Sequence, residues 1–210
     1  MKRIVLAILL FVGFVSIAWL TQTHALLLRD QSLLETLSTF RSEGLLSVAN
    51  VIVFPFNTYP SIVLAVVVLA LCARIGKAES VARFLMLAVT LIILSKLEKY
   101  VFLRMRPTPS GESLYPGYSF PSAHMLRATA LYLGALASLP PQLIQKKKSL
   151  WIGLGLALLL VLASAELLLQ RNYPTDMLGG FLLGTAWVSL FSGLWDSKGH
   201  GEEIATHRSI

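Results

Sequence analysis

The sequence predicts an all-α integral membrane protein that folds as a bundle of six transmembrane helices. Hydrophobic residues make up 55% of the chain and charged residues only 14%, whereas soluble domains contain about 25% charged residues. The mean hydropathy of +0.70 has the same origin, because a helix needs about 20 mostly apolar residues to cross a bilayer. On this interpretation residues 1–195 form one membrane domain, with no separate soluble domain.

Six segments have the length and apolar character of transmembrane helices. They cover residues 4–20, 58–75, 81–103, 123–140, 150–169 and 174–195. The first follows Met1-Lys2-Arg3, as in a signal peptide, but no small-residue cleavage site follows it and it exceeds the usual apolar length. We therefore expect a retained first helix. Residues 196–210 form a short polar tail, for which we expect no regular structure.

The segment at residues 24–56 separates the first two spans and is less apolar than they are. Its apolar residues recur at helical spacing between charged ones. This pattern predicts an amphipathic helix that lies at the membrane interface or caps the bundle. Pro55 and Pro60 mark the end of the segment.

The basic residues predict the orientation of the bundle. They gather in four groups, at residues 2–3, 74–83, 146–148 and 198–208. With six spans the four groups share one side, which the positive-inside rule identifies as the cytoplasm. Both termini are then cytoplasmic, and the loops 24–57, 104–122 and 170–173 face the periplasm or the exterior. We expect the membrane to be a bacterial inner (plasma) membrane.

Charge and cysteine content exclude other classes of function. The net charge of +7 follows from the basic loops, so we expect no nucleic-acid partner. Cys72 is the one cysteine of the chain, which excludes a disulfide framework and a cysteine-based metal site.

Polar residues cluster in three places on the predicted outer side. The first cluster comprises Lys99, Arg104 and Arg106 at the end of the third span. A lysine at this depth is costly unless it snorkels or has a partner. The two arginines depart from the charge bias of the loops, which indicates a role other than topology, although binding to lipid headgroups would also explain them.

The other two clusters open the fourth and sixth spans. Ser122 is a predicted N-cap, and the free N–H groups of the helix that it opens suit a phosphate. His124 follows in the first turn. At the sixth span, Asn172 or Thr175 is a candidate cap and Asp176 lies in the first turn. Alone, His124 could be a structural hydrogen-bonding residue and Asp176 an ordinary first-turn acid, but their convergence with cations predicts a phosphate site.

These clusters resemble the three-part signature of the type 2 phosphatidic acid phosphatases, which belong with the vanadium haloperoxidase-like superfamily. The first part, K-x6-R-P, matches residues 99–107. The second, P-S-x-H, matches residues 121–124, with Ala123 where the family has glycine. The third ends in Y-P-x-D at residues 173–176. The resemblance covers about residues 60–195.

The resemblance implies a six-helix membrane enzyme that removes phosphate from lipids, often at the outer leaflet, without a metal or another cofactor. His124 would be the general acid that protonates the leaving oxygen. Asp176 would orient a nucleophilic histidine. The residues that would bind the phosphate are Lys99, Arg106, Ser122 and the backbone amide of Ala123.

The third part departs from the family pattern S-R-x5-H-x3-D. Counting back from Asp176 places the family histidine at Asn172. The family arginine and serine fall at Glu166 and Ala165. The lone pair of a carboxamide nitrogen is delocalised, so Asn172 does not attack phosphorus as a neutral imidazole does. Glu166 also reverses the local charge, which changes about 4 kcal/mol of attraction for a phosphate into repulsion at about 4 Å.

Other residues offer partial compensation. Arg171 could supply the lost cation from a different angle. His24 lies in the first outer segment and is a candidate replacement nucleophile, although no activating base lies near it in the sequence. A carboxylate at the outer end of the fifth span requires a partner. We predict an ion pair between Glu166 and Lys99 or Arg106, with Arg171 as the remaining candidate.

Three functions follow from these observations. The first is recognition of the phosphate head of a phospholipid or polyprenyl (di)phosphate without phosphohistidine catalysis. The second is an active lipid phosphatase with a rewired site, acting on phosphatidic acid, phosphatidylglycerophosphate or undecaprenyl diphosphate. The third is a structural membrane partner that keeps the motifs for stability alone.

Overall fold

The computed structural model describes residues 1–23, 25–75, 78–107 and 117–207, and at residues 98–100, 141 and 197–207 it describes the backbone alone. The described part is helical and contains no strand. In chain order its elements are α1 (Lys2–Gln22), α2 (Leu27–Ser38), α3 (Glu43–Val53), the 3-10 turn η1 (Phe54–Phe56), α4 (Thr58–Ile75), α5 (Ala78–Val101), α6 (Ala123–Ser138), α7 (Pro141–Gln145), α8 (Lys148–Leu168) and α9 (Pro174–His207).

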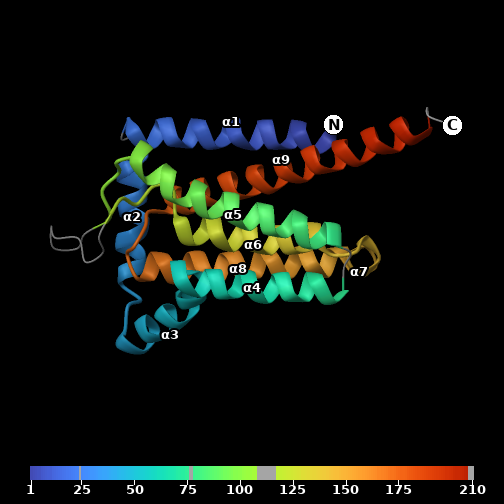
Figure 1. Ribbon diagram of the computed structural model, residues 1–210. Helices are drawn as coiled ribbons and strands as arrows, with labels where there is room; N and C mark the ends of the chain where they lie inside the picture. The colour runs from blue at the N-terminus through green and yellow to red at the C-terminus, as the bar shows by residue number, and fades with distance from the viewer. Residues whose placement is uncertain (24, 76–77, 108–116, 208–210) are drawn as a thin grey trace.

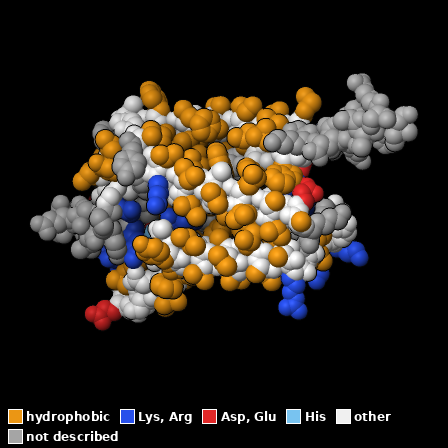
Figure 2. All heavy atoms as spheres, in the orientation of Figure 1, with side chains coloured by type: hydrophobic (Ala, Val, Ile, Leu, Met, Phe, Trp, Pro, Cys, Tyr) orange, Lys and Arg blue, Asp and Glu red, His pale blue; other side chains and the backbone are white. Residues whose placement is uncertain are grey.

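The long helices lie side by side and form a bundle (Figure 1). Helix α2 runs across one end of this bundle, whereas α7 and both chain termini lie at the opposite end. Figure 2 shows hydrophobic side chains over the middle of the visible face, with Lys and Arg side chains toward its two ends. An apolar band between polar ends is the arrangement expected of a bundle that crosses a bilayer.

Five of the described helices are long and apolar enough to cross a membrane: α1, α4, α5, α8 and α9. The fourth expected span, at residues 123–140, is the shorter helix α6 of 16 residues. Its rise of about 24 Å is less than the bilayer core of about 30 Å. Helix α6 ends at Ser138 because Pro140 and Pro141 follow closely, and the residue before a proline disfavours helical backbone.

Residues 25–56 form two helices and a 3-10 turn rather than the one amphipathic helix that the sequence predicts, and α2 runs across one end of the bundle. The chain leaves α2 after Ser38, and Ser42 then caps α3 by accepting a hydrogen bond from the N–H of Leu45 at 3.3 Å. Asp30 and Leu34 are the buried residues of α2. Helix α2 therefore turns an apolar and acidic face toward the bundle.

The end of the chain also differs from the sequence prediction. Helix α9 continues past the predicted span and ends at His207. Residues 196–207 are therefore helical rather than an irregular tail, and no proline interrupts them.

Aromatic and glycine contacts place α6 and α9 at the centre of the bundle. The ring of Phe120 stacks on Phe14 of α1 with centroids 5.7 Å apart and meets the edge of Phe102 at 5.2 Å. Gly180 of α9 allows the backbone of α6 to come close, because a Cβ at this position would lie 2.5 Å from the carbonyl oxygen of Ser122. This approach brings the N-terminal ends of the two helices together.

We expect Gly180→Ala to lower the stability of the protein by about 1–3 kcal/mol, the usual cost of overpacking. The new methyl group would meet the backbone oxygen of Ser122 at 2.5 Å, and the backbone nitrogen of Leu126 and the Cβ of Met125 at 3.1 Å, so the backbone would have to shift. Thermal unfolding of the purified protein in detergent measures the effect. Gly153→Ala in α8 is the matched control, since a Cβ there meets nothing within 4 Å, and equal losses in both variants would contradict this account.

Candidate functional site

A cavity of about 590 Å³ opens at the α2 end of the bundle. It is lined by the N-terminal ends of α4 and α6, the C-terminal half of α5, and the loops that precede α6 and α9. The lining residues are Asn57, Thr58, Ser61, Ile62, Ile92, Ser95, Lys96, Arg106, Ala123, His124, Arg127, Arg171 and Asn172.

Four cations line this cavity and give it a positive potential. Lys96 comes from α5, Arg127 from α6, and Arg106 and Arg171 from two loops. Protein groups orient the arginines: Arg127 donates to the carbonyl of Phe56 at 2.8 Å, and Arg106 donates to the carbonyl of Arg171. Such a set of positioned donors suits a phosphate.

The sequence motifs predicted Arg106 and Arg171 as site residues, but they did not predict Lys96 and Arg127. A signal for both was present, because charged residues within apolar spans commonly mark functional sites. Lys96 lies three residues before Lys99, and Arg127 lies three residues after His124, so each shares a helix face with a predicted site residue. The side chain of Lys99 lies outside the described part of the structure.

Glu166 and Asn172 form a buried pair beside the cations. Their exposed fractions are 0% and 1%, and the Nδ2 of Asn172 donates to Glu166. Glu166 Oε1 lies 3.9 Å from a guanidinium nitrogen of Arg171. The predicted ion pair of Glu166 is therefore present with Arg171, one of the three candidate cations.

His124 lies between α4 and α8. Its Nε2 is 2.9 Å from Oδ1 of Asn57, and its Nδ1 is 3.3 Å from Oε1 of Glu166. Both ring nitrogens thus contact oxygen atoms of the protein, and the side chain still lines the cavity. His24, the other histidine considered as a nucleophile, lies outside the described residues.

Ser122 and Ala123 differ in where they lie. Ser122 is fully buried, and its Oγ accepts the N–H of Met125 at 3.3 Å, as predicted for an N-cap. Its backbone N–H donates to the carbonyl of Asp176 at 3.0 Å. Ala123 lines the cavity. The side chain of Ser122 therefore serves the helix end, whereas Ala123 is placed to meet a ligand.

Helix α9 begins at Pro174, so neither Asn172 nor Thr175 is its N-cap. Asp176 accepts the N–H of Tyr173 at 2.7 Å, which is the reciprocal half of a capping box. Pro174 takes the first helical position, where a missing N–H costs nothing.

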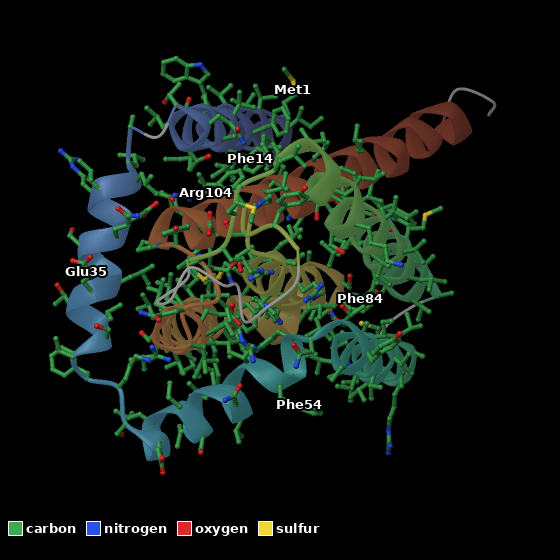
Figure 3. All side chains as sticks on the ribbon, turned by 90° about the vertical axis from the view of Figure 1, so that its left-hand side faces the viewer. Met1, Phe14, Glu35, Phe54, Phe84 and Arg104 are labelled. Atoms are coloured by element: carbon green, nitrogen blue, oxygen red, sulfur yellow. The ribbon has the colours of Figure 1, made fainter. Side chains whose placement is uncertain are left out.

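Arg104 forms a buried ion cluster next to the cavity. Its guanidinium lies 2.7 Å from Asp30 of α2 and 2.7 Å from Asp176 of α9, and the three side chains are at most 8% exposed. Figure 3, which looks onto this end of the bundle, places Arg104 between α2 and the first turn of α9. Burial alone would lower the pKa of Arg104, but Asp176 and Asp30 outweigh it and raise the pKa. Asp176 therefore serves Arg104 and the start of α9, whereas Asn172 binds Glu166.

Among the described residues no group of three or more His, Cys, Asp or Glu side chains could hold a metal ion. Four of the residues that line the cavity are cationic, and cations repel a metal ion whereas they attract a phosphate.

We expect Arg104→Gln to lower the free energy of unfolding by about 3–5 kcal/mol, because it leaves two buried carboxylates without their cation. Chemical unfolding in detergent measures the loss. Arg3→Gln is the control: Arg3 pairs with Asp196 at 2.8 Å, but the two side chains are 53% and 42% exposed, and removing an exposed pair costs at most about 1 kcal/mol. Similar losses in both variants would argue against a structural role for the Arg104 cluster.

Comparison with known proteins agrees with this fold. The profile of the PAP2 superfamily matches residues 61–198. The crystal structure of the first transmembrane PAP2 type phosphatidylglycerolphosphate phosphatase from Bacillus subtilis superposes with a TM-score of 0.80, covering 91% of this chain and 96% of that one at 24% identity. A comparison with curated protein sequences found no match. The chain is an integral membrane protein, and it belongs to the PAP2 superfamily, as its resemblance to type 2 phosphatidic acid phosphatases predicted.

Proposed function

We propose that this protein recognises the phosphate head of a membrane lipid, a phospholipid or a polyprenyl (di)phosphate, without forming a phosphohistidine. The observation that carries the proposal is the buried pair of Asn172 and Glu166 within a cation-lined cavity. Binding groups for a phosphate are present, while the group expected to attack it is an amide that already donates to a carboxylate.

The electrostatics of the cavity support binding without turnover. Lys96, Arg106, Arg127 and Arg171 line it, and hydrogen bonds from charged donors to phosphate are about twice as strong as neutral ones. Glu166 offsets part of the positive charge of the cavity, because its carboxylate pairs with Arg171. An amide at position 172 has no free lone pair on nitrogen, so it provides no route to a covalent phosphoenzyme.

We also propose six membrane spans, with both termini in the cytoplasm and the cavity facing the periplasm or the exterior. Support comes from the arrangement in Figure 1, where both termini and α7 lie opposite the α2 end. The exposed lysines at 146–148 follow α7 directly, as the positive-inside rule expects of cytoplasmic loops. Helix α6, the fourth in chain order, would complete the six spans. Its apolar stretch is shorter, and the surrounding helices shield it.

A lipid phosphatase with a rewired site is the second candidate, and one contact favours it. Glu166 lies 3.3 Å from Nδ1 of His124, which is the arrangement of a carboxylate that orients a catalytic imidazole. The B. subtilis neighbour is named for phosphatidylglycerolphosphate hydrolysis, so this lipid and phosphatidic acid are the first substrates to assay. A structural partner without a ligand is the third candidate.

We expect the purified protein to bind short-chain phosphatidic acid and to release no phosphate from it. Arg171→Gln should weaken binding by about 10-fold, as expected for the loss of a charged hydrogen bond, and Lys96→Gln should also weaken it. Calorimetric titration measures binding, and a colorimetric assay measures phosphate.

Arg74→Gln is the control, because Arg74 lies in the last turn of α4, at the other end of the bundle from the cavity. Phosphate release that His124→Ala abolishes would establish the rewired phosphatase and overturn the proposal. Absence of phosphatidic acid binding would leave the third candidate, a structural partner without a ligand.

We expect the double variant Glu166→Arg with Asn172→His to gain lipid phosphatase activity. The first change restores a cation and the second an imidazole at the positions of the family pattern, within a cavity that keeps its other cations. Phosphate release from phosphatidic acid measures the gain. Asn172→His alone is the matched control and should be less active, since Glu166 would still repel the phosphate. A folded double variant without activity would show that changes at positions other than 166 and 172 also prevent catalysis.

A further inference from the structure

The loop between α8 and α9 begins with a residue in a strained backbone conformation. Helix α8 ends in a Schellman motif, in which the N–H of Gln170 donates to the carbonyl of Leu167 at 3.0 Å and the N–H of Arg171 donates to that of Glu166 at 3.2 Å. The motif needs a left-handed residue, and the φ of Gln170 is 52°. Glycine is the usual residue here, because a Cβ disfavours this conformation. A side chain that is kept at such a position indicates a role for the side chain itself.

The side chains of this loop are tied to the segment that contains α2 and α3. Arg41, which lies between the two helices, donates to Oε1 of Gln170 at 2.9 Å. Arg171 donates from Nη2 to Oδ1 of Asn50 in α3 at 2.9 Å. The amide of Asn50 is itself oriented, because its Nδ2 donates to the carbonyl of Leu46 at 2.9 Å. Two hydrogen bonds therefore hold the loop from the side of α3, which packs against α8.

These two tethers orient two cations of the cavity. One is Arg171 itself, and the other is Arg106, which donates to the backbone carbonyl of Arg171. Both arginines line the cavity, whereas Arg41 and Asn50 do not. A side chain that is ordered before the ligand arrives loses less conformational entropy on binding. The tethers can thus raise the affinity for a phosphate without touching it.

Asn50 also opposes the pull of Glu166 on Arg171. Nη1 of Arg171 lies 3.9 Å from Oε1 of Glu166, which is longer than the roughly 2.7–2.9 Å of a charge-assisted hydrogen bond. Asn50 accepts from the other terminal nitrogen, Nη2, at 2.9 Å. Without this second acceptor the guanidinium would move against the carboxylate, and the cavity would lose part of its positive potential.

We propose that Arg41 and Asn50 are positioning residues of the phosphate site, which hold Arg171 and, through its carbonyl, Arg106 in the orientation that receives the ligand. Both residues precede the range 61–198 that the family profile matches, so the positioning comes from a part of the chain outside that match. The inference rests on the proposed function, because it assigns the residues that prepare the same site.

A double-mutant cycle on the purified protein in detergent tests the role of Asn50. We expect Asn50→Leu to weaken the binding of short-chain phosphatidic acid by about 5-fold, as expected when a side chain must be ordered on binding. In the Arg171→Gln background the same change should have no further effect, because Asn50 acts through the guanidinium. Ser47→Leu is the control, since Ser47 is an exposed polar residue of the same helix and should leave the affinity unchanged.

A second pair of variants tests Arg41. We expect Arg41→Gln to weaken phosphatidic acid binding by about 3-fold, because Gln170 loses its tether and the loop becomes less ordered. Arg29→Gln is the matched control for charge: it removes one cation from the same segment, at an exposed position of α2. Calorimetric titration measures the affinities, and thermal unfolding of each variant shows that it is folded.

The outcomes separate this inference from the proposed function. Equal weakening by Asn50→Leu in both backgrounds, or unchanged affinity, would overturn the role of Asn50. Unchanged affinity in Arg41→Gln, or an equal loss in Arg29→Gln, would overturn that of Arg41. In each case binding by the unmodified protein would leave the proposed function intact. Absence of phosphatidic acid binding by the unmodified protein would overturn the proposed function and this inference together.

Discussion

The buried guanidinium of Arg104 is the interaction on which the functional end of this bundle depends. It joins Asp30 of the capping helix α2 to Asp176 in the first turn of α9, and it belongs to the loop that also carries Arg106. Thr175 bonds Asp30 as well. Two carboxylates buried this deeply are tolerable only with a cation between them. The cluster thereby fixes the loop at residues 171–176 relative to α2 and α6, and with it the cavity wall formed by Arg171 and Asn172.

The resemblance to the family implies that Asp176 orients a nucleophilic histidine, whereas in this structure Asp176 has a structural role. Asp176 stabilises Arg104 and the start of α9, so its carboxylate is engaged in the fold. At the two positions that depart from the family pattern, the amide of Asn172 donates a hydrogen bond to the carboxylate of Glu166. The two substitutions suit each other, because Glu166 can accept from Asn172 and an arginine at that position could not. Their physical complementarity explains how both are accommodated within a buried site.

The cavity combines elements that are distant in the chain. Its cations come from α5, α6 and the loops before α6 and α9, and its neutral polar residues come from α4, α5, α6 and the loops before α4 and α9. A bundle in which glycines such as Gly180 allow close helix contact holds these groups within one space. The face in Figure 2 is apolar over its middle, and the polar groups of the cavity lie at one end of the bundle. The architecture therefore favours a ligand with an apolar tail and a charged, hydrogen-bonding head.

The sequence by itself determined the helical membrane class, the bounds of the long apolar helices to within a few residues except at the C-terminal end of α9, the Ser122 cap and the family, because hydropathy and local motifs are encoded over short stretches. It also identified Arg106, Ala123, His124, Arg171 and Asn172, all of which line the cavity. Only the tertiary structure decided that Arg171 pairs with Glu166, that Arg104 rather than position 172 engages Asp176, and that Lys96 and Arg127 join the site. Partner choice among several cations depends on distances between helices, which local pattern does not encode.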